Sequence, residues 1–366
     1  MLFLGAGASA AFGVPTMQQL TESCEKLLLE RGYPEARLSK IKSSLKRYGF
    51  VPDFEGMLTI LDAFVTPYKG VAAAGPLAAY LADLSSEWPP QKKDPPDHLR
   101  ELKRMLSEKC LQANMDDAIN CYNKLFSTLA EVQRSIRVDK TRASALKGGV
   151  LVPGDKSGLR TQDIFTTNYD LVIEKYFDHR AQMRDSLKHG FVLRGNRMVW
   201  DPRHGFGYGW DQEKTNLVKL HGSIDQSFFL DGIEKRQVEP DKGFYQSPAF
   251  ERMMIFPVHE KYATHSPYYD LLSLLRQRLA VEPVCVVIGF SFRDEAVNNA
   301  FVDALKENPD LKIVYIGGED AHKNIQEIKE VIFKTRTKVI PLEFDSDGGY
   351  INELGVALTE WYPEHY

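Results

Sequence analysis

The chain opens with four apolar residues, MLFL, that run directly into the glycine-rich segment Gly5-Ala6-Gly7-Ala8-Ser9-Ala10. A short apolar run that stops at a glycine turn is typical of a buried parallel strand. After Pro15, apolar residues recur at helical spacing from 16 to 31, and Gly32 stands where a helix commonly ends. The segment therefore predicts the first strand, loop and helix of an α/β fold.

The last third of the chain alternates strands and helices in the same way. Strands are expected at 284–288, 311–316 and 338–342, and helices at 295–306, 321–333 and 350–361. This alternation is the signature of a Rossmann-like, doubly wound parallel sheet. Because the first strand belongs with these last strands, we expect one domain over residues 1–366, into which the middle of the chain is inserted.

Two insertions are expected between these parts. Residues 33–160 read as a helical subdomain, with helices at 36–48, 55–65, 72–86, 98–108 and 116–136, a proline-rich break at 88–96 and a closing loop at 148–158. A strand at 163–167 and a helix at 169–177 follow. Residues 189–260 read as a small β-rich insertion, with strands at 191–200 and 217–220, a hairpin of 227–230 with 233–238, and an irregular loop at 204–210.

Composition narrows the class of protein. Apolar residues make up 43% and charged residues 26%, which is typical of a globular protein, and the net charge of −4 gives no basic field for direct nucleic-acid binding. The four cysteines are far apart and form no C-x-x-C pair, so we expect reduced, mostly buried thiols and no metal. Without a membrane-length apolar run or a signal peptide, we expect a cytoplasmic protein.

The first glycine segment fits the pattern G-x-G-x-x-G/A between a strand and a helix. Glycines there let backbone amides approach a pyrophosphate, and the following helix N-terminus favours negative charge. Glycine turns of this kind also occur for purely steric reasons. The pattern alone leaves both interpretations open.

Thr166-Thr167-Asn168-Tyr169-Asp170 stands at the carboxyl end of an expected strand, where open α/β sheets bind ligands. The amide of Asn168 offers donors and an acceptor, and the carboxylate of Asp170 accepts from ribose hydroxyls or an amide. The alternative is that one of the two caps the next helix.

Two later strand ends carry further polar groups. His221 follows one strand and precedes Gly222, so its imidazole has the chemistry of a general base, although a structural histidine is the alternative. The segment Gly289-Phe290-Ser291-Phe292-Arg293-Asp294 runs from another strand into a helix. There Gly289 and Ser291 are candidates to line a phosphate or ribose, while Arg293 and Asp294 pair with each other or cap the helix.

In order along the chain, GAGASAAFGVP, TTNYD, KLHGS and IGFSFRD resemble the NAD-binding signatures of the sirtuins. TTNYD and GFSFRDE resemble the divergent bacterial sirtuin-like proteins of antiphage defence more than the protein deacylases. The resemblance implies a Rossmann-like sheet with an inserted subdomain. It also implies that NAD is the substrate and that Asn168, Asp170 and His221 are the catalytic residues. The cofactor-binding residues that it implies, with their neighbours in the same segments, are Gly5, Ala6, Gly7, Ser9, Pro15, Thr167, Gly289, Ser291 and Asp294.

Two departures separate this sequence from the deacylases. Deacylase sirtuins carry a four-cysteine zinc module after the catalytic histidine, whereas only Cys285 lies beyond His221 here. Their Asp-Phe-Arg run after the first loop is replaced by Thr16-Met17-Gln18. The resemblance therefore implies an NAD⁺ glycohydrolase that releases nicotinamide and ADP-ribose. The alternatives are an NAD-dependent deacylase, an ADP-ribosyl transferase and a non-catalytic NAD sensor.

An NAD-depleting effector must be held inactive until it is triggered, and the sequence contains no obvious sensor domain. We therefore expect regulation by homo-oligomerisation or by a separate partner, such as a DNA-translocase-type ATPase or an Argonaute-like protein. The helical insertion at 33–160 is the expected docking surface.

Overall fold

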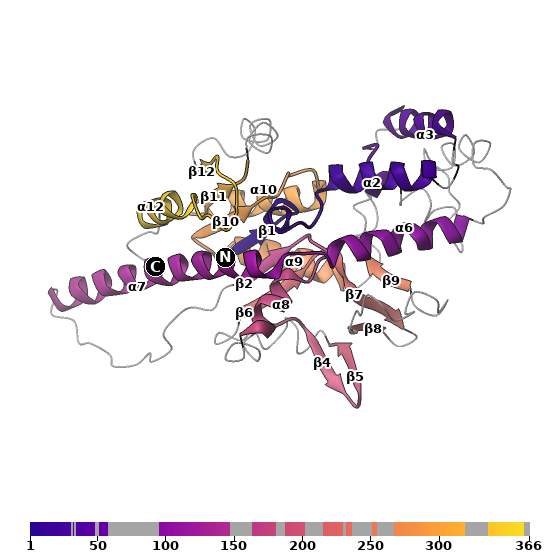
Figure 1. The fold of residues 1–366 in the computed structure, drawn as a ribbon. Coiled ribbons are helices and arrows are strands. Elements are labelled where there is room, and N and C mark those ends of the chain that lie inside the picture. Colours follow the sequence, from indigo (N-terminus) through magenta and orange to yellow (C-terminus); the bar gives the residue numbers. More distant parts are fainter. Residues whose placement is uncertain are drawn as a thin grey trace.

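The fold is built around one parallel sheet. The computed structural model describes residues 1–30, 32, 34–47, 51–57, 95–146, 163–180, 187–201, 215–229, 232–235, 251–254, 267–318 and 336–361. Within them, seven strands form a sheet in the order β12-β11-β10-β1-β2-β6-β3 (Figure 1). These strands are β1 (Leu2–Leu4), β2 (Asp163–Thr166), β3 (Leu187–Lys188), β6 (Thr215–Lys219), β10 (Val284–Ile288), β11 (Lys312–Ile316) and β12 (Thr337–Ile340).

The first strand lies in the middle of this sheet. Leu2 pairs with Ile164 of β2 on one side and with Val286 of β10 on the other, and both pairings are parallel. The chain first extends the sheet from β1 in one direction and later returns to extend it in the other. This reversal of strand order confirms the predicted doubly wound sheet.

Helices cover both faces of the sheet. Leu2 and Leu4 join one apolar core, while Met1 and Phe3 join a second core on the opposite face, as the period of two in a strand requires. Residues of α9 (Tyr268–Leu279) and α10 (Glu295–Glu307) fill the second core. Those of α2 (Met17–Glu30), α8 (Val172–His179) and α12 (Ile351–Trp361) pack in the first.

The helices between β1 and β2 pack into the first core as well. They are α3 (Glu35–Arg47), α6 (Pro95–Cys110) and α7 (Met115–Leu146), which follow the predicted helices at 36–48, 98–108 and 116–136. Figure 1 shows α7 extending well beyond the sheet, and it continues past its predicted end. α6 begins at Pro95, where a proline lacks only a hydrogen bond that the first helical turn does not make. The predictions at 72–86, 148–158, 204–210 and 321–333 lie outside the described residues.

A second, antiparallel sheet has the order β4-β5-β8-β7-β9. Its strands are β4 (Phe191–Arg194), β5 (Arg197–Trp200), β7 (Gly222–Phe229), β8 (Gly232–Lys235) and β9 (Glu251–Met254). The single strand predicted at 191–200 is wrong. It is a hairpin in which Phe191 pairs with Trp200, and Gly195 turns the chain with a φ of 63°. Within 189–260, β6 belongs to the parallel sheet, so the chain passes between the two sheets there.

Two smaller expectations concern the thiols and the helices. All four cysteines are buried and unpaired, as expected. Among the described helices, none combines the length and the apolar character that crossing a bilayer requires.

Candidate functional site

The first glycine loop packs directly against the turn that follows β10. Gly5 N donates to Ile288 O at 2.9 Å, and Gly7 N donates to Gly289 O at 2.9 Å. A Cβ on Gly7 would lie 2.7 Å from the Cα of Gly289, and one on Gly289, whose φ is 61°, would collide with the backbone of Ala8. The glycines are therefore needed for this close backbone contact. It brings two of the predicted site segments together where the strand order reverses.

Asn168 ties the end of β2 to the first loop. Its Nδ2 donates to Gly5 O at 2.9 Å and to Ser9 Oγ at 3.2 Å, and its backbone N donates to Thr166 Oγ1 at 3.0 Å. Within the part of the chain that the structure describes, no donor is paired with its Oδ1. Asn168 therefore positions the loop with one end of its amide and presents an acceptor at the other.

Asp170 takes a different role from Asn168. Its Oδ1 accepts from the backbone N of Val172, the first residue of α8, at 3.0 Å, while the N-cap position of the helix is Leu171. The carboxylate thus holds the start of α8 from one residue before the cap. Asp170 also lines a small cavity with Asn168 and Ser9. That cavity measures about 10 Å³, which is room for one water, so a nucleotide would lie outside it.

The ammonium group of Lys219, at the end of β6, lies beneath the loop that carries Asn168. Its Nζ donates to Asp170 O, to Glu174 Oε1 at 3.1 Å and to Ser223 Oγ at 2.9 Å. The side chain is only 6% exposed, and these three acceptors use all three of its protons. These three hydrogen bonds of Lys219 hold the loop between β2 and α8 in place. Lys219 was not among the predicted site residues, because one lysine in KLHGS gives no local signal of burial.

His221 is paired with a carboxylate from the other side of the sheet. Its Nε2 donates to Asp294 Oδ2 at 2.8 Å, while Asp294 Oδ1 accepts from Val297 N at 3.0 Å and caps α10. The cap was one of the alternatives for Asp294, whereas the contact with His221 was not expected. A carboxylate at Nε2 fixes the tautomer in which Nδ1 carries the lone pair. The imidazole is therefore held in one orientation by Asp294.

Because β2 and β6 are adjacent parallel strands, their carboxyl ends place Asn168 and His221 at the same edge of the parallel sheet. Leu220 N donates to Thr166 O at 2.8 Å, and Thr167 N donates to Leu4 O at 3.2 Å. Tyr169 lies next to Asn168 in sequence, and its ring centroid is 6.2 Å from that of His221. Four predicted segments thus meet at the carboxyl ends of β1, β2, β6 and β10.

The remaining predicted residues occupy the same loops. Ala6 precedes the four-residue helix α1 (Gly7–Ala10) and Pro15 follows it, while Ser291 lies between two buried phenylalanines. One of these, Phe292, has a φ of 52°, which is rare outside glycine. This unusual backbone turns the chain into Arg293 and Asp294 before α10 begins.

Glu55, in the helical insertion, also reaches this edge. Tyr169 OH donates to Glu55 Oε1 at 3.2 Å. Burial and, after it, the nearby Asp53 raise the pKa of the Glu55 carboxyl to about 8. Glu55 was not predicted as a site residue, because its partner Tyr169 lies 114 positions later in the chain.

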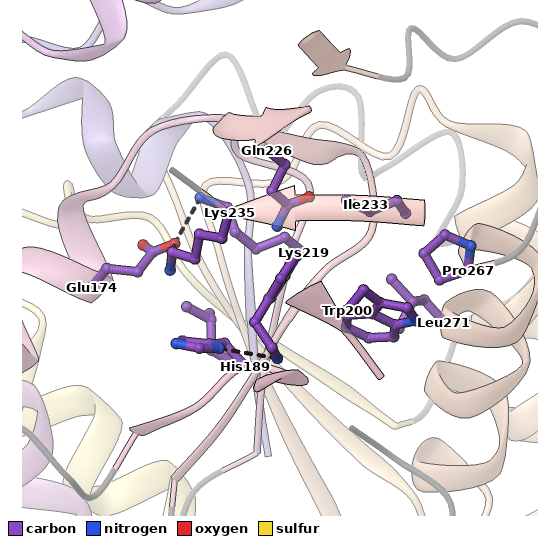
Figure 2. A pocket seen from close by; sticks show the side chains of 11 residues that line it. Glu174, His189, Trp200, Lys219, Gln226, Ile233, Lys235, Pro267 and Leu271 are labelled. Atoms are coloured by element: carbon purple, nitrogen blue, oxygen red, sulfur yellow. Dashed lines mark hydrogen bonds and ion pairs between the residues drawn. The ribbon is translucent and has the colours of Figure 1, made fainter. Parts of the chain in front are cut away.

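A buried cluster of charges links α8 to the antiparallel sheet. Lys235 Nζ lies 3.3 Å from Asp225 Oδ2 and 3.9 Å from Glu174 Oε1. Beside it is a cavity of about 20 Å³, with Glu174 on one side and Trp200 on the other (Figure 2). Burial, and to a lesser degree Lys235, lowers the pKa of His189 to about 3. The cavity has room for water only, and the ion pairs tie α8 to β7 and β8.

The fold and this edge define an α/β protein whose polar site lies at a topological switch point. A family model described as a SIR2-like domain matches residues 162–335. These residues therefore resemble a SIR2-like domain, and they include Asn168, His221 and Asp294. The first loop lies outside the match.

Solved structures of Sir2 homologues resemble the chain distantly. A Sir2 homologue in complex with NAD has 12% sequence identity and a TM-score of 0.43, over 98% of this chain and 89% of that one. A mutant homologue in complex with 2′-O-acetyl ADP-ribose has 12% identity and a TM-score of 0.43, over 98% and 91%. A further mutant homologue with ADP-ribose has 12% identity and a TM-score of 0.42, over 98% and 91%. The search of curated proteins found no match.

Proposed function

We propose that this protein is an NAD⁺ glycohydrolase that cleaves the bond between nicotinamide and ribose. The observation that carries the proposal is the meeting of two functional groups at one sheet edge. Asn168 contacts Gly5 and Ser9 of the first loop, and on the adjacent strand end His221 is held by Asp294. The SIR2-like domain at 162–335 supports the choice of NAD as the substrate.

In the proposed reaction, the bond between C1′ of the ribose and the nicotinamide nitrogen breaks, and the bonding electrons leave with nicotinamide. Positive charge develops on the ribose, and water attacks C1′. Asn168 Oδ1 orients the water or a ribose hydroxyl, and His221 Nδ1 accepts the proton that is lost. The products are nicotinamide, ADP-ribose and one proton.

The buried pair of His221 and Asp294 supports proton transfer as the role of the histidine. When His221 accepts a proton, its ring becomes positive, and the carboxylate 2.8 Å from Nε2 stabilises that charge.

Two features of the sequence favour water over an acyl-lysine as the acceptor. Beyond His221 the chain has the single cysteine Cys285, and a zinc module of four cysteines is therefore not encoded there. Thr16-Met17-Gln18 stands in place of the Asp-Phe-Arg run of the deacylases.

The test is nicotinamide release from NAD by the purified protein, over concentrations that span monomer and assembly. We expect release by the wild type and its loss in Asn168→Ala and His221→Ala, with NAD binding retained in the His221 variant. Asn120→Ala, on the exposed face of α7, is the matched control. Full activity in Asn168→Ala, or no release by the wild type under any condition, contradicts the proposal.

The same samples separate the alternative functions. Mass spectrometry that finds 2′-O-acyl-ADP-ribose points to a deacylase, and ADP-ribosylated protein points to a transferase. NAD binding that changes the assembly state without nicotinamide release points to a sensor.

We further propose that the enzyme is the NAD-depleting effector of a bacterial antiphage defence system. The resemblance of TTNYD and GFSFRDE to such proteins supports this role. Control by self-assembly or by a partner docked on residues 33–160 remains a prediction. A strict monomer in size-exclusion chromatography, alone and with the products of neighbouring genes, contradicts it.

A further inference from the structure

A short segment of the helical insertion, residues 51–57, holds a carboxyl group against the candidate site. Phe54 is fully buried, and its backbone N donates to Thr21 Oγ1 of α2 at 2.9 Å. Gly56 N donates to Asp53 Oδ1 at 2.9 Å, and a Cβ on Gly56 would collide with the carbonyl oxygen of Val51. The segment is therefore fixed, and so is the position of Glu55 within it.

Tyr169 connects Glu55 to the groups that are proposed to act on NAD. Its hydroxyl donates to Glu55 Oε1 at 3.2 Å, and its ring centroid lies 6.2 Å from that of His221. The backbone of Tyr169 is held separately, because its carbonyl accepts from Ile224 N at 3.1 Å and from Ser223 Oγ at 3.3 Å. The backbone of Tyr169 is thus fixed, and the hydrogen bond to Glu55 holds the hydroxyl end of its side chain.

The charges around Glu55 favour its neutral form. The titratable groups that face it in the described structure are Asp53 in its own segment, Tyr169 after β2, and Arg293 and Asp294 before α10. Burial is the largest effect, and Asp53 and Asp294 add negative charge, which together outweigh Tyr169 and Arg293. Below pH 7 the carboxyl is therefore mostly protonated, and its carbonyl oxygen accepts the hydrogen bond from Tyr169.

We propose that Glu55 is a positioning residue of the NAD-cleaving site, which holds Tyr169 beside His221 and Asn168. This inference rests on the proposed function. It assigns a role in the reaction to the helical insertion, which supplies Glu55 to a site otherwise built from the ends of the parallel strands. When Glu55 ionises, it repels Asp294, and Asp294 is the group that orients His221.

The pH dependence of nicotinamide release distinguishes a positioning role of Glu55 from a purely structural contact. Nicotinamide release by the wild type is expected to fall on the alkaline side with an apparent pKa near 8. Glu55→Gln keeps a carbonyl acceptor for Tyr169 and cannot ionise, so we expect it to match the wild type at pH 6.5 and to lose this alkaline limb. Glu35→Gln, an exposed carboxyl on α3, is the matched control and keeps the limb.

Removal of the contact is expected to lower kcat rather than raise KM. Glu55→Ala and Tyr169→Phe each remove one hydrogen bond, so each should lower kcat by about tenfold at pH 6.5. The double variant should lose no more than either single variant, because both remove the same contact. Multiplicative losses, or an alkaline limb that survives in Glu55→Gln, overturn the inference.

A binding measurement separates this inference from the proposed reaction. Calorimetry with ADP-ribose at pH 6.5 and pH 9 should show weaker binding at pH 9 for the wild type and no such change for Glu55→Gln. If no variant releases nicotinamide but this difference is seen, the reaction is wrong, and only the coupling of Glu55 to the nucleotide site stands. If nicotinamide is released but Glu55→Gln behaves as the wild type in both assays, the role of Glu55 is wrong. If neither effect is seen, both are wrong.

Discussion

His221 Nε2 lies 2.8 Å from Asp294 Oδ2, although the two residues are 73 positions apart in the chain. Both side chains are 5% exposed, so little water screens the contact. Asp294 also caps α10, which fixes its second oxygen. Asp294, at the start of α10 on one side of β1 in the strand order, thereby orients His221, which follows β6 on the other side of β1.

Replacement of Asp294 by asparagine tests the importance of this charge. Asparagine keeps an oxygen for the helix cap but removes the negative charge that faces the imidazole. We expect kcat for nicotinamide release to fall at least about tenfold, with little change in NAD affinity. Asp303→Asn, on the exposed face of α10, should leave kcat unchanged. Equal kcat values for the two variants would show that the charge on Asp294 has no part in the reaction.

The ammonium of Lys219 should stabilise the protein strongly. Lys219→Met leaves Glu174 buried with a weaker partner, Lys235 at 3.9 Å, and leaves two more acceptors unpaired. Loss of one partner from a buried ion pair typically costs about 3 to 5 kcal/mol, which denaturant unfolding measures. Lys306→Met breaks an exposed pair and should cost less than about 1 kcal/mol. Similar losses of unfolding free energy in both variants would show that Lys219 does not hold this loop in place.

A methyl group at Gly289 should disrupt the junction of the first loop with β10. Gly289→Ala adds a Cβ at a positive φ and in collision with the backbone of Ala8, so we expect a loss of at least about 3 kcal/mol. Gly195→Ala has nearly the same φ, 63°, and no atom within 4 Å of the new Cβ. It should therefore lose only about 1 kcal/mol. Thermal unfolding of the two variants separates crowding from backbone strain.

His189 should make stability depend on pH on the acidic side. Its pKa is lowered to about 3 in the folded protein from an ordinary value of 6.5, so the unfolded chain binds the proton more readily. The contribution of neutral His189 to stability is present above pH 6.5 and is lost as the pH falls toward 3. His189→Asn keeps an acceptor for Phe191 N and does not titrate. Denaturant unfolding should show a smaller loss for this variant than for the wild type between pH 6.5 and pH 4.5.

Local patterns were sufficient for most of the parallel sheet. The run MLFL before Gly5 predicted β1, and the alternation after residue 283 predicted β10, β11 and β12, because buried parallel strands and amphipathic helices have distinct periods. The hairpin of β4 and β5 was missed, although Gly195-Asn196 between Arg194 and Arg197 is a typical two-residue hairpin turn.

The site was predictable only as a set of separate segments. Each segment shows in its own residues that it follows a strand, whereas Asn168 and His221 were selected by the resemblance of the four ordered segments to the sirtuins. The pairing of His221 with Asp294 and of Tyr169 with Glu55 depends on tertiary contacts between distant parts of the chain. Such pairs leave no periodic trace in one sequence, so only the folded structure reveals them.

The central place of β1 has a consequence for synthesis of the protein. Met1 N donates to Val284 O, 283 positions later in the chain. The second edge of β1 is therefore paired only after β10 has been synthesised. His221 likewise gains its carboxylate partner only after Asp294 has been synthesised. A nascent chain on the ribosome, or one that ends early, therefore has no assembled site. Under the proposed function, the order of strands prevents unfinished copies from consuming the NAD of the cell that makes them.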